Sequence, residues 1–250
     1  MSNETAKRPV TFKTPGQSKV WKVVEAVVKG QQEPTKFTIR ELPEDRYEDA
    51  IDHMCTYFIA EEPICKYWNG KDDPEYVQSF RALWAEVVKQ GLTVAAFVDD
   101  PKGGKPILAG VNMLLLSQKG EKENLDGILK SERSRLLVWS MEVLIKAGNV
   151  YDVYGTDKYI NALGLSVQPS YQGAALGAHL LNARENIGRE YGISATATVF
   201  TSPIAQRLAA RCGYTDLVVK DFEDLVDVKG NKLCPGIGLK QLKLMGKKLY

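Results

Sequence analysis

Short apolar runs rich in β-branched residues recur along the chain, between longer segments whose apolar residues are three or four positions apart. Runs of the first kind are typical of strands, and segments of the second kind are typical of amphipathic helices. The first two runs flank a turn-rich segment and predict a hairpin. Strands are predicted over residues 21–28, 36–42, 92–98, 107–116, 162–167, 193–200, 216–222 and 238–245.

The helical segments have clear start and stop signals. Pro63 ends the first predicted helix near Glu62, because proline cannot continue a helix. Asp73 and Pro74 form an N-cap pair for the second, and Gly91 ends it. Helices are predicted over residues 43–62, 74–91, 131–146, 175–191 and 202–212.

The order of these elements indicates an α/β fold. Strands and helices alternate, but hairpins near both ends make the sheet mixed and mostly antiparallel. We expect about seven strands flanked by helices. Residues 19–250 are predicted to form one domain, and the polar residues 1–18 a flexible N-terminal arm.

Composition favours a soluble, intracellular protein. The chain has 250 residues, 44% of them hydrophobic, and a net charge of +2, which gives no strong field to attract nucleic acid or an anionic membrane. No apolar run is long enough to span a membrane, and the first ten residues do not resemble a secretory signal. We therefore expect a cytoplasmic protein that binds neither nucleic acid nor membranes.

Cysteine and histidine spacing argues against a metal site. Cys-x-x-Cys pairs are lacking, and the chain has only two histidines, His53 and His179. Neither histidine is assigned a catalytic role. The four cysteines are predicted to be reduced core thiols: Cys55, Cys65, Cys212 and Cys234.

The segment "LSVQPSYQGAALGAHLL", residues 165–181, contains more small residues than a turn needs. Between a strand and a helix, such residues let an anion approach several backbone N–H groups at the positive end of the helix dipole. A phosphate or pyrophosphate fits this nest, and a tightly packed turn is the alternative. Dinucleotide and P-loop sites are excluded because neither Gly-x-Gly-x-x-Gly nor Gly-Lys-Ser/Thr occurs.

This segment resembles the acetyl-CoA signature of the GCN5-related acetyltransferase (GNAT) superfamily, Arg/Gln-x-x-Gly-x-Gly/Ala. The blocks "FTIRELPEDRYEDAIDHMCTYFIAEEPI", "YGTDKYINALGLSV" and "RCGY" are similar to the insect arylalkylamine N-acetyltransferases, in the same order from Phe37 to the C-terminus. Ala175 departs from the pattern, since the family usually has glycine there. A helical backbone conformation at this position would tolerate alanine.

The resemblance implies acetyl-CoA as cosubstrate, no metal, and a GNAT-like fold. Its amides would hold the pyrophosphate, and a backbone N–H of the preceding strand would meet the thioester oxygen as it gains charge. The implied cofactor-binding residues are Leu165, Ser166, Val167, Gln172, Gly173, Ala174, Ala175, Leu176, Gly177 and Ala178.

The resemblance also implies catalytic residues. Acyl transfer to an amine needs a base, because an alkylammonium has a pKa of about 10. The family's glutamate before proline corresponds to Glu62. Thr201 and Ser202 correspond to hydroxyls near the coenzyme sulfur, although Ser202 is also a good N-cap. Ala205 stands where the family's best-studied branch has serine.

The implied function is transfer of an acetyl group to a small primary amine, such as an arylalkylamine, agmatine or a polyamine, by direct attack in a ternary complex. Tyr57, Phe58, Tyr67 and Trp68 could contact an aromatic amine, or could be core residues. Asp72 and Asp73 could favour a second cationic group, and Tyr214 is an alternative acid. The alternatives are a weakly active protein that binds acyl-CoA or amines, and acylation of a protein N-terminus or lysine. A monomer or weak dimer is expected.

Overall fold

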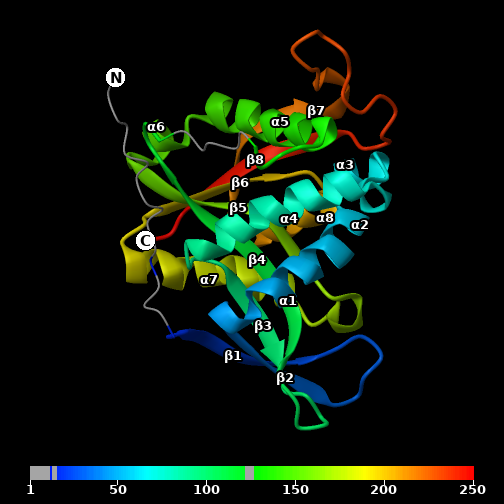
Figure 1. Ribbon diagram of the computed structural model, residues 1–250. Helices are drawn as coiled ribbons and strands as arrows, with labels where there is room; N and C mark the ends of the chain where they lie inside the picture. The colour runs from blue at the N-terminus through cyan, green and yellow to red at the C-terminus, as the bar shows by residue number, and fades with distance from the viewer. Residues whose placement is uncertain (1–11, 13–15, 122–126) are drawn as a thin grey trace, which may run out of the picture.

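One sheet runs through the middle of the molecule, with strand order β1-β2-β3-β4-β5-β6-β8-β7 (Figure 1). The computed structural model describes residues 12, 16–121 and 127–250. Neighbouring strands are antiparallel except β5 and β6, which are parallel. The strands are β1 (Val20–Val27), β2 (Pro34–Glu41), β3 (Val94–Val98), β4 (Ile107–Gln118), β5 (Lys158–Val167), β6 (Ala195–Phe200), β7 (Thr215–Asp221) and β8 (Gln241–Lys248).

The expected α/β class and mostly antiparallel sheet are confirmed, with eight strands in the described residues. The helices are α1 (Tyr47–His53), α2 (Ile59–Glu61), α3 (Pro63–Tyr67), α4 (Pro74–Lys89), α5 (Glu132–Gly148), α6 (Val150–Tyr154), α7 (Leu176–Tyr191) and α8 (Pro203–Arg211). The Asp73 cap is also confirmed, since its Oδ1 accepts the N–H groups of Glu75 and Tyr76. The predicted arm, residues 1–18, lies mostly outside the described residues.

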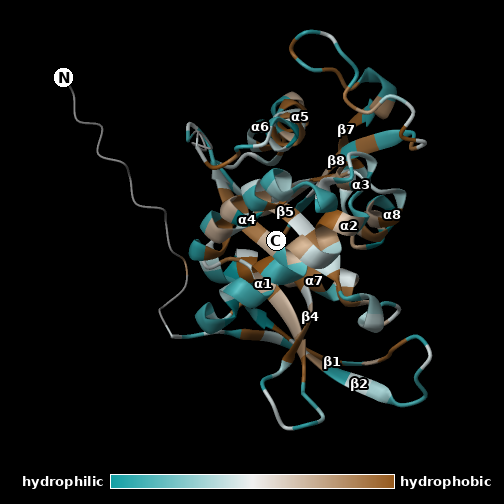
Figure 2. Ribbon diagram, turned by 45° about the vertical axis from the view of Figure 1, so that its right-hand side comes forward, coloured by the Kyte–Doolittle hydropathy of each residue, from teal (hydrophilic) through white to brown (hydrophobic). Residues whose placement is uncertain are grey.

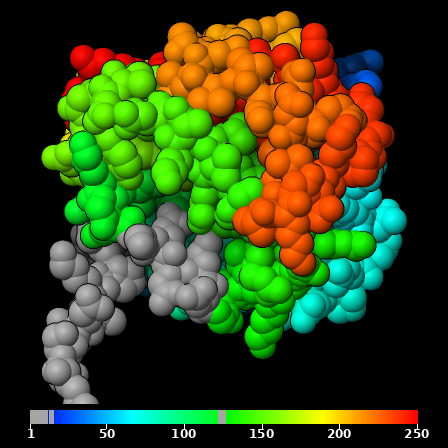
Figure 3. All heavy atoms as spheres, turned by 90° about the horizontal axis from the view of Figure 1, so that it is seen from above, coloured from blue at the N-terminus to red at the C-terminus, as the bar shows by residue number. Residues whose placement is uncertain are grey.

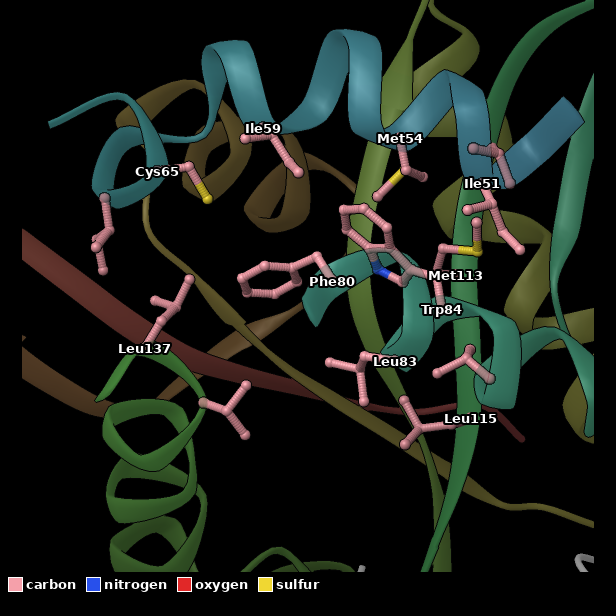
Figure 4. Close-up of a cluster of buried hydrophobic side chains, with 14 of the residues drawn as sticks. Ile51, Met54, Ile59, Cys65, Phe80, Leu83, Trp84, Met113, Leu115 and Leu137 are labelled. Carbon is pink, nitrogen blue, oxygen red and sulfur yellow. The ribbon is translucent and has the colours of Figure 1, made fainter. Parts of the chain in front are cut away.

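Helices cover both faces of the sheet (Figure 1). Because successive strand residues point to opposite faces, Ala95 and Phe97 pack with α1, α4 and α5, whereas Val94 and Ala96 pack with α7. Figure 2 shows apolar colours along the central strand β4. Figure 4 shows the first of these cores, where Ile51, Met54 and Ile59 point toward Phe80 and Trp84.

The first predicted helix is interrupted by a π-helical segment, η2 (Met54–Phe58). This segment lies against a bulge in β5, where Asn112 pairs with Leu165 and Leu114 with Ala162, so that β5 carries one more residue than β4. Gly164 in the bulge has φ +117°, and a Cβ there would lie 2.5 Å from the Met54 methyl carbon. The absence of a side chain at Gly164 therefore lets η2 approach the strand.

The bulge is held from both sides. The Trp84 indole N–H donates to the Leu163 carbonyl at 2.8 Å, and the Asn112 amide donates to the Gly164 carbonyl at 2.9 Å. These bonds satisfy carbonyls that leave the regular strand ladder. The backbone of residues 163–164 is therefore fixed by side chains of α4 and β4.

Replacing Gly164 by alanine is expected to lower the free energy of unfolding by about 3 kcal/mol, because backbone strain and a core clash add. Denaturant unfolding measures the change. Gly192→Ala is the matched control, since Gly192 has φ +63° with nothing within 4 Å of an added Cβ. It should cost only about 1 kcal/mol. If the two variants lost equal free energy of unfolding, the packing of η2 would not depend on the missing side chain at Gly164.

Candidate active site

The sheet opens beside β5 into a cavity of about 640 Å³. Strands β5 and β6 are paired only at Ile160 and Thr196, and beyond this pair they separate. Residues 161–167 form one wall of the cavity and residues 198–202 form another, with further lining from α5, α7 and α8. The splayed strands thus expose main-chain groups of β5 that a regular sheet would pair.

The alternating hydrogen-bond pattern between β4 and β5 shows which main-chain groups of β5 face the cavity. The Gln168 N–H donates to the Ala109 carbonyl of β4, and register pairs Ser166 with Val111. Because antiparallel ladders alternate between bonded and non-bonded pairs, the main chain of Ser166 turns to β4, and the main chains of Leu165 and Val167 turn to the cavity. The gap therefore offers the N–H groups of Leu165 and Val167.

Glu62 lies at the cavity wall with 9% of its surface exposed. It follows α2 with φ −63° and ψ 129°, and is the N-cap of α3. Its Oε2 accepts the Cys65 N–H at 2.7 Å, and its Oε1 accepts the Thr201 hydroxyl at 2.6 Å. Each carboxylate oxygen keeps a further lone pair. The side chain is thus held in one orientation by α3 and by the end of β6.

Thr201 and Ser202 line the same cavity but differ in hydrogen bonding. The Thr201 proton is engaged with Glu62, whereas the Ser202 Oγ accepts the Ala205 N–H at 3.1 Å. The predicted N-cap role of Ser202 is confirmed. In the described residues its hydroxyl proton has no acceptor, so Ser202 is the freer donor of the two.

The loop from Gln172 leads into α7, and Gln172 and Gly177 line the cavity. The N–H groups of Ala178 and His179 bond back to the Ala175 carbonyl. Within the part of the chain that the structure describes, the N–H groups of residues 173–177 have no partner. The start of α7 therefore has unpaired main-chain donors that an anion could accept from.

Two glycines let this loop fit its surroundings. Gly173 has φ +93°, and a Cβ on Gly177 would lie 2.9 Å from a Leu208 methyl carbon of α8. The expectation that Ala175 has a helical conformation is wrong, because it has φ +55° in the left-handed region. Glycine would adopt this conformation without strain, and alanine does so at a cost.

His53 contacts the strand that forms the cavity wall. Its Nε2 lies 3.1 Å from the Ser166 hydroxyl, and its ring packs edge-on against Tyr57. Burial lowers the pKa of His53 to about 4, so it is neutral near pH 7. His53 therefore fixes the side chain of a predicted cofactor-binding residue, a contact that the sequence did not reveal.

Some residues weighed for the site lie elsewhere. Tyr57 and Phe58 line the cavity, but Tyr67, Trp68, Asp72 and Asp73 line a second, open hollow of about 510 Å³ together with Leu233. In Figure 3 the orange-to-red segment after β7 lies beside the cyan segment that carries α3 and α4. Tyr214 is buried outside the cavity lining, so the structure gives no support to the alternative acid.

The thiols near Glu62 are poor nucleophiles. Burial and then the charge of Glu62 raise the pKa of Cys65 well above its usual range and that of Cys234 to about 12. All four cysteines are free, three of them buried and Cys55 half-buried. Neither Cys65 nor Cys234 is a thiolate at neutral pH.

Arg184, which was not predicted as a site residue, lines the cavity from α7 and is 1% exposed. The available signal was its place on the apolar stripe of the helix, four residues after Leu180 and three before Ile187. A charged residue on such a stripe needs an explanation.

Comparison with known proteins decides the family. The model of the acetyltransferase (GNAT) family matches residues 116–214. The crystal structure of an insect putative arylalkylamine N-acetyltransferase 7 from the yellow fever mosquito Aedes aegypti is 30% identical, with a TM-score of 0.86, and the alignment covers 98% of this chain and 100% of that one. The chain belongs to the acetyltransferase (GNAT) family.

More distant members share the GNAT fold. Arylalkylamine N-acetyltransferase 2 from Aedes aegypti is 21% identical over 86% of this chain and 99% of its own, with a TM-score of 0.69. A Drosophila melanogaster polyamine N-acetyltransferase is 15% identical over 85% of this chain and 99% of its own, with a TM-score of 0.66. No curated protein sequence matches the chain. Within the described residues, no helix could cross a membrane.

Ala175→Gly is expected to raise the free energy of unfolding by about 1 kcal/mol, because glycine removes the left-handed strain. Thermal unfolding measures the gain. Ala174→Gly is the control in the same loop: Ala174 is buried and has no positive φ. That variant should destabilise the protein through lost packing and a more flexible unfolded chain. Stabilisation by both changes, or by neither, would contradict the strain at Ala175.

His53 should make stability depend on pH. Its pKa is about 4 in the folded protein and about 6.5 unfolded, so the unfolded chain binds more protons between these values, and stability falls as pH falls through this window. Relative to His53→Gln, the wild-type protein should lose up to about 3 kcal/mol between pH 7 and 4. Denaturant unfolding at several pH values measures this. His179→Gln, at a half-buried site, should show a smaller effect, and a difference independent of pH for His53→Gln would contradict the argument.

Proposed function

We propose that this GNAT protein transfers an acetyl group from acetyl-CoA to a small primary amine by direct attack in a ternary complex. The observation that carries the proposal is one cavity shared by an oriented carboxylate, Glu62, and a splayed strand whose main chain is open. Family membership makes acetyl-CoA the expected donor. The unpaired N–H groups of residues 173–177, at the start of α7, fit its pyrophosphate.

Glu62 is proposed as the base. The ammonium of the amine loses a proton to the carboxylate, directly or through water, and the neutral nitrogen attacks the thioester carbon. The N–H of Leu165 or Val167 would donate to the oxygen as it becomes negative. The carbon–sulfur bond then breaks with its electron pair on sulfur, the nitrogen releases its second proton to solvent, and the Ser202 hydroxyl can donate a hydrogen bond to the thiolate. Thr201 is better placed to orient Glu62.

Among the candidate amines, the cavity favours an arylalkylamine over agmatine or a polyamine. Its carboxylates are Glu61 and Glu62, and the Glu61 side chain is 72% exposed and pairs with Lys66. The remaining wall is largely apolar, with Phe58, Phe80 and Met141 among its residues. A second ammonium would therefore be desolvated with no buried acid to receive it. Asp72 and Asp73 cannot supply one, since they line the other hollow.

Glu62→Gln is expected to reduce kcat/KM at neutral pH by about 10²- to 10⁴-fold, the range of general base catalysis, because an amide cannot take the proton. Steady-state turnover with acetyl-CoA and tyramine, dopamine, serotonin, agmatine or spermine measures this and ranks the amines. The glutamine amide oxygen can accept the Cys65 N–H, and the Thr201 hydroxyl can turn to accept a hydrogen bond from the amide NH2, so the fold should persist. Glu61→Gln is the control and should be unchanged.

An unchanged kcat/KM for Glu62→Gln would refute the assigned base. Preference for agmatine or spermine would refute the specificity argument. The second candidate, a protein that binds acyl-CoA with little turnover, is motivated by Ala175 and by Ala205 where the family branch has serine. Tight CoA binding by calorimetry, without acetyl transfer to any amine, would favour it.

A further inference from the structure

Arg184 is a buried cation. Most of its N–H groups have hydrogen-bond acceptors, but no described carboxylate balances its positive charge. Its Nε and Nη2 donate to the Asn112 Oδ1 at 3.1 and 2.9 Å. Its Nη1 donates to the Thr196 and Thr198 hydroxyls at 2.9 and 2.8 Å. Four of the five guanidinium N–H groups thus have neutral acceptors, and no described carboxylate forms an ion pair with it.

The guanidinium lies where the two strands separate. Thr196 is the β6 residue of the single β5–β6 pair, and its hydroxyl donates to the Ile160 carbonyl across that pair. Asn112 donates to the Gly164 carbonyl in the β5 bulge. Arg184, Asn112 and Thr198 all line the cavity. The positive charge therefore sits at the vertex of the opening in which acetyl transfer is proposed.

Burying a cation without an anion is costly, and a structural role alone does not require the charge. Burial lowers the pKa of Arg184, but a guanidinium stays protonated in proteins. With most N–H groups already engaged, Arg184 cannot offer a carboxylate ligand the two free donors of a bidentate bond. It can act on a ligand chiefly through its field, which is weakly screened in a buried site.

We infer that Arg184 is the counter-charge for the negative charge that appears on the coenzyme during acetyl transfer. This inference rests on the proposed function. When the amine nitrogen bonds to the acetyl carbon, the carbon–sulfur bond breaks, the electron pair stays on sulfur as the CoA thiolate, and the ammonium protons pass to Glu62 and solvent. The field of Arg184 stabilises the thiolate and disfavours the ammonium form of the amine. It therefore favours both the deprotonation of the amine and the departure of the thiolate.

The distance makes the effect measurable. The resemblance implies that the coenzyme sulfur lies near Thr201, and Thr198, which the guanidinium contacts, precedes Thr201 by three residues of extended chain, about 10 Å. A unit charge at that distance in a site of intermediate dielectric shifts a pKa by about one unit. The Glu62 carboxylate acts in the opposite direction, so the thiol of CoA bound to this protein should have a pKa about one unit below its value in a variant without the Arg184 charge.

The test is a pH titration of the CoA thiolate by its ultraviolet absorbance in the protein complex, with the desulfo-CoA complex subtracted to remove tyrosines and cysteines. Arg184→Gln should raise the thiol pKa by about one unit and lower kcat, with CoA affinity changing less. Arg184→Lys, which keeps the charge, should restore most of the shift. Arg189→Gln removes a charge from the exposed side of the same helix and should change nothing.

The same thiol pKa in the wild-type protein and in Arg184→Gln would overturn the inference while leaving the proposed function intact. If Arg184→Gln does not fold, Glu62→Gln decides: with that opposing charge removed, a bound thiol no more acidic than that of free CoA also overturns the inference. Failure of the wild-type protein to bind CoA would instead refute the proposed function.

Discussion

The separation of β5 from β6 is the constraint on which the rest of the site depends. One residue pair joins the two strands, and past it each strand turns its main chain toward a cavity instead of toward the other. A sheet does not open in this way without support, because unpaired backbone groups and a wedge of empty space are both unfavourable. Here the support comes from side chains: Trp84 and Asn112 hold the bulge in β5, and Arg184 bridges Asn112 to β6.

The same opening places two distant parts of the chain together. Glu62 belongs to the helices near the start of the chain, and Thr201 follows β6 almost 140 residues later, yet their side chains are hydrogen-bonded. The Glu62 carboxylate is fixed on its other side by the first turn of α3. The geometry of the carboxylate is therefore set by α3 and by the residue that follows β6, and the two hydrogen bonds limit its freedom to rotate.

Much of this arrangement could be predicted from sequence, because it follows local rules. Asp73 and Ser202 are capping residues that precede proline, and both caps are observed. The features that were not predicted correctly depend on tertiary contacts. The π-helical segment can lie close to β5 because Gly164, more than 100 residues away, leaves room for Met54 and Phe58. Ala175 was expected in a helical conformation because residue type alone does not report φ, and the loop imposes the left-handed region.

Contacts between polar groups were the least predictable. Arg184 looks like a surface residue by type, and although it lies on the apolar stripe of α7, its partners on β4 and β6 could not be predicted. Tyr67 and Trp68 were grouped with Glu62 by proximity along the chain, but α3 turns them toward another hollow. Sequence spacing can place a residue on an element, but the direction of its side chain depends on how that element packs.

The N-cap bond from Glu62 to α3 affects how position 62 should be interpreted across relatives. A side chain that can accept a hydrogen bond would be retained there by folding alone, even in a protein that had lost its reaction. Glutamate at this position in another sequence is therefore ambiguous evidence of enzymatic activity, and its hydroxyl partner at the end of β6 is a more informative companion to inspect.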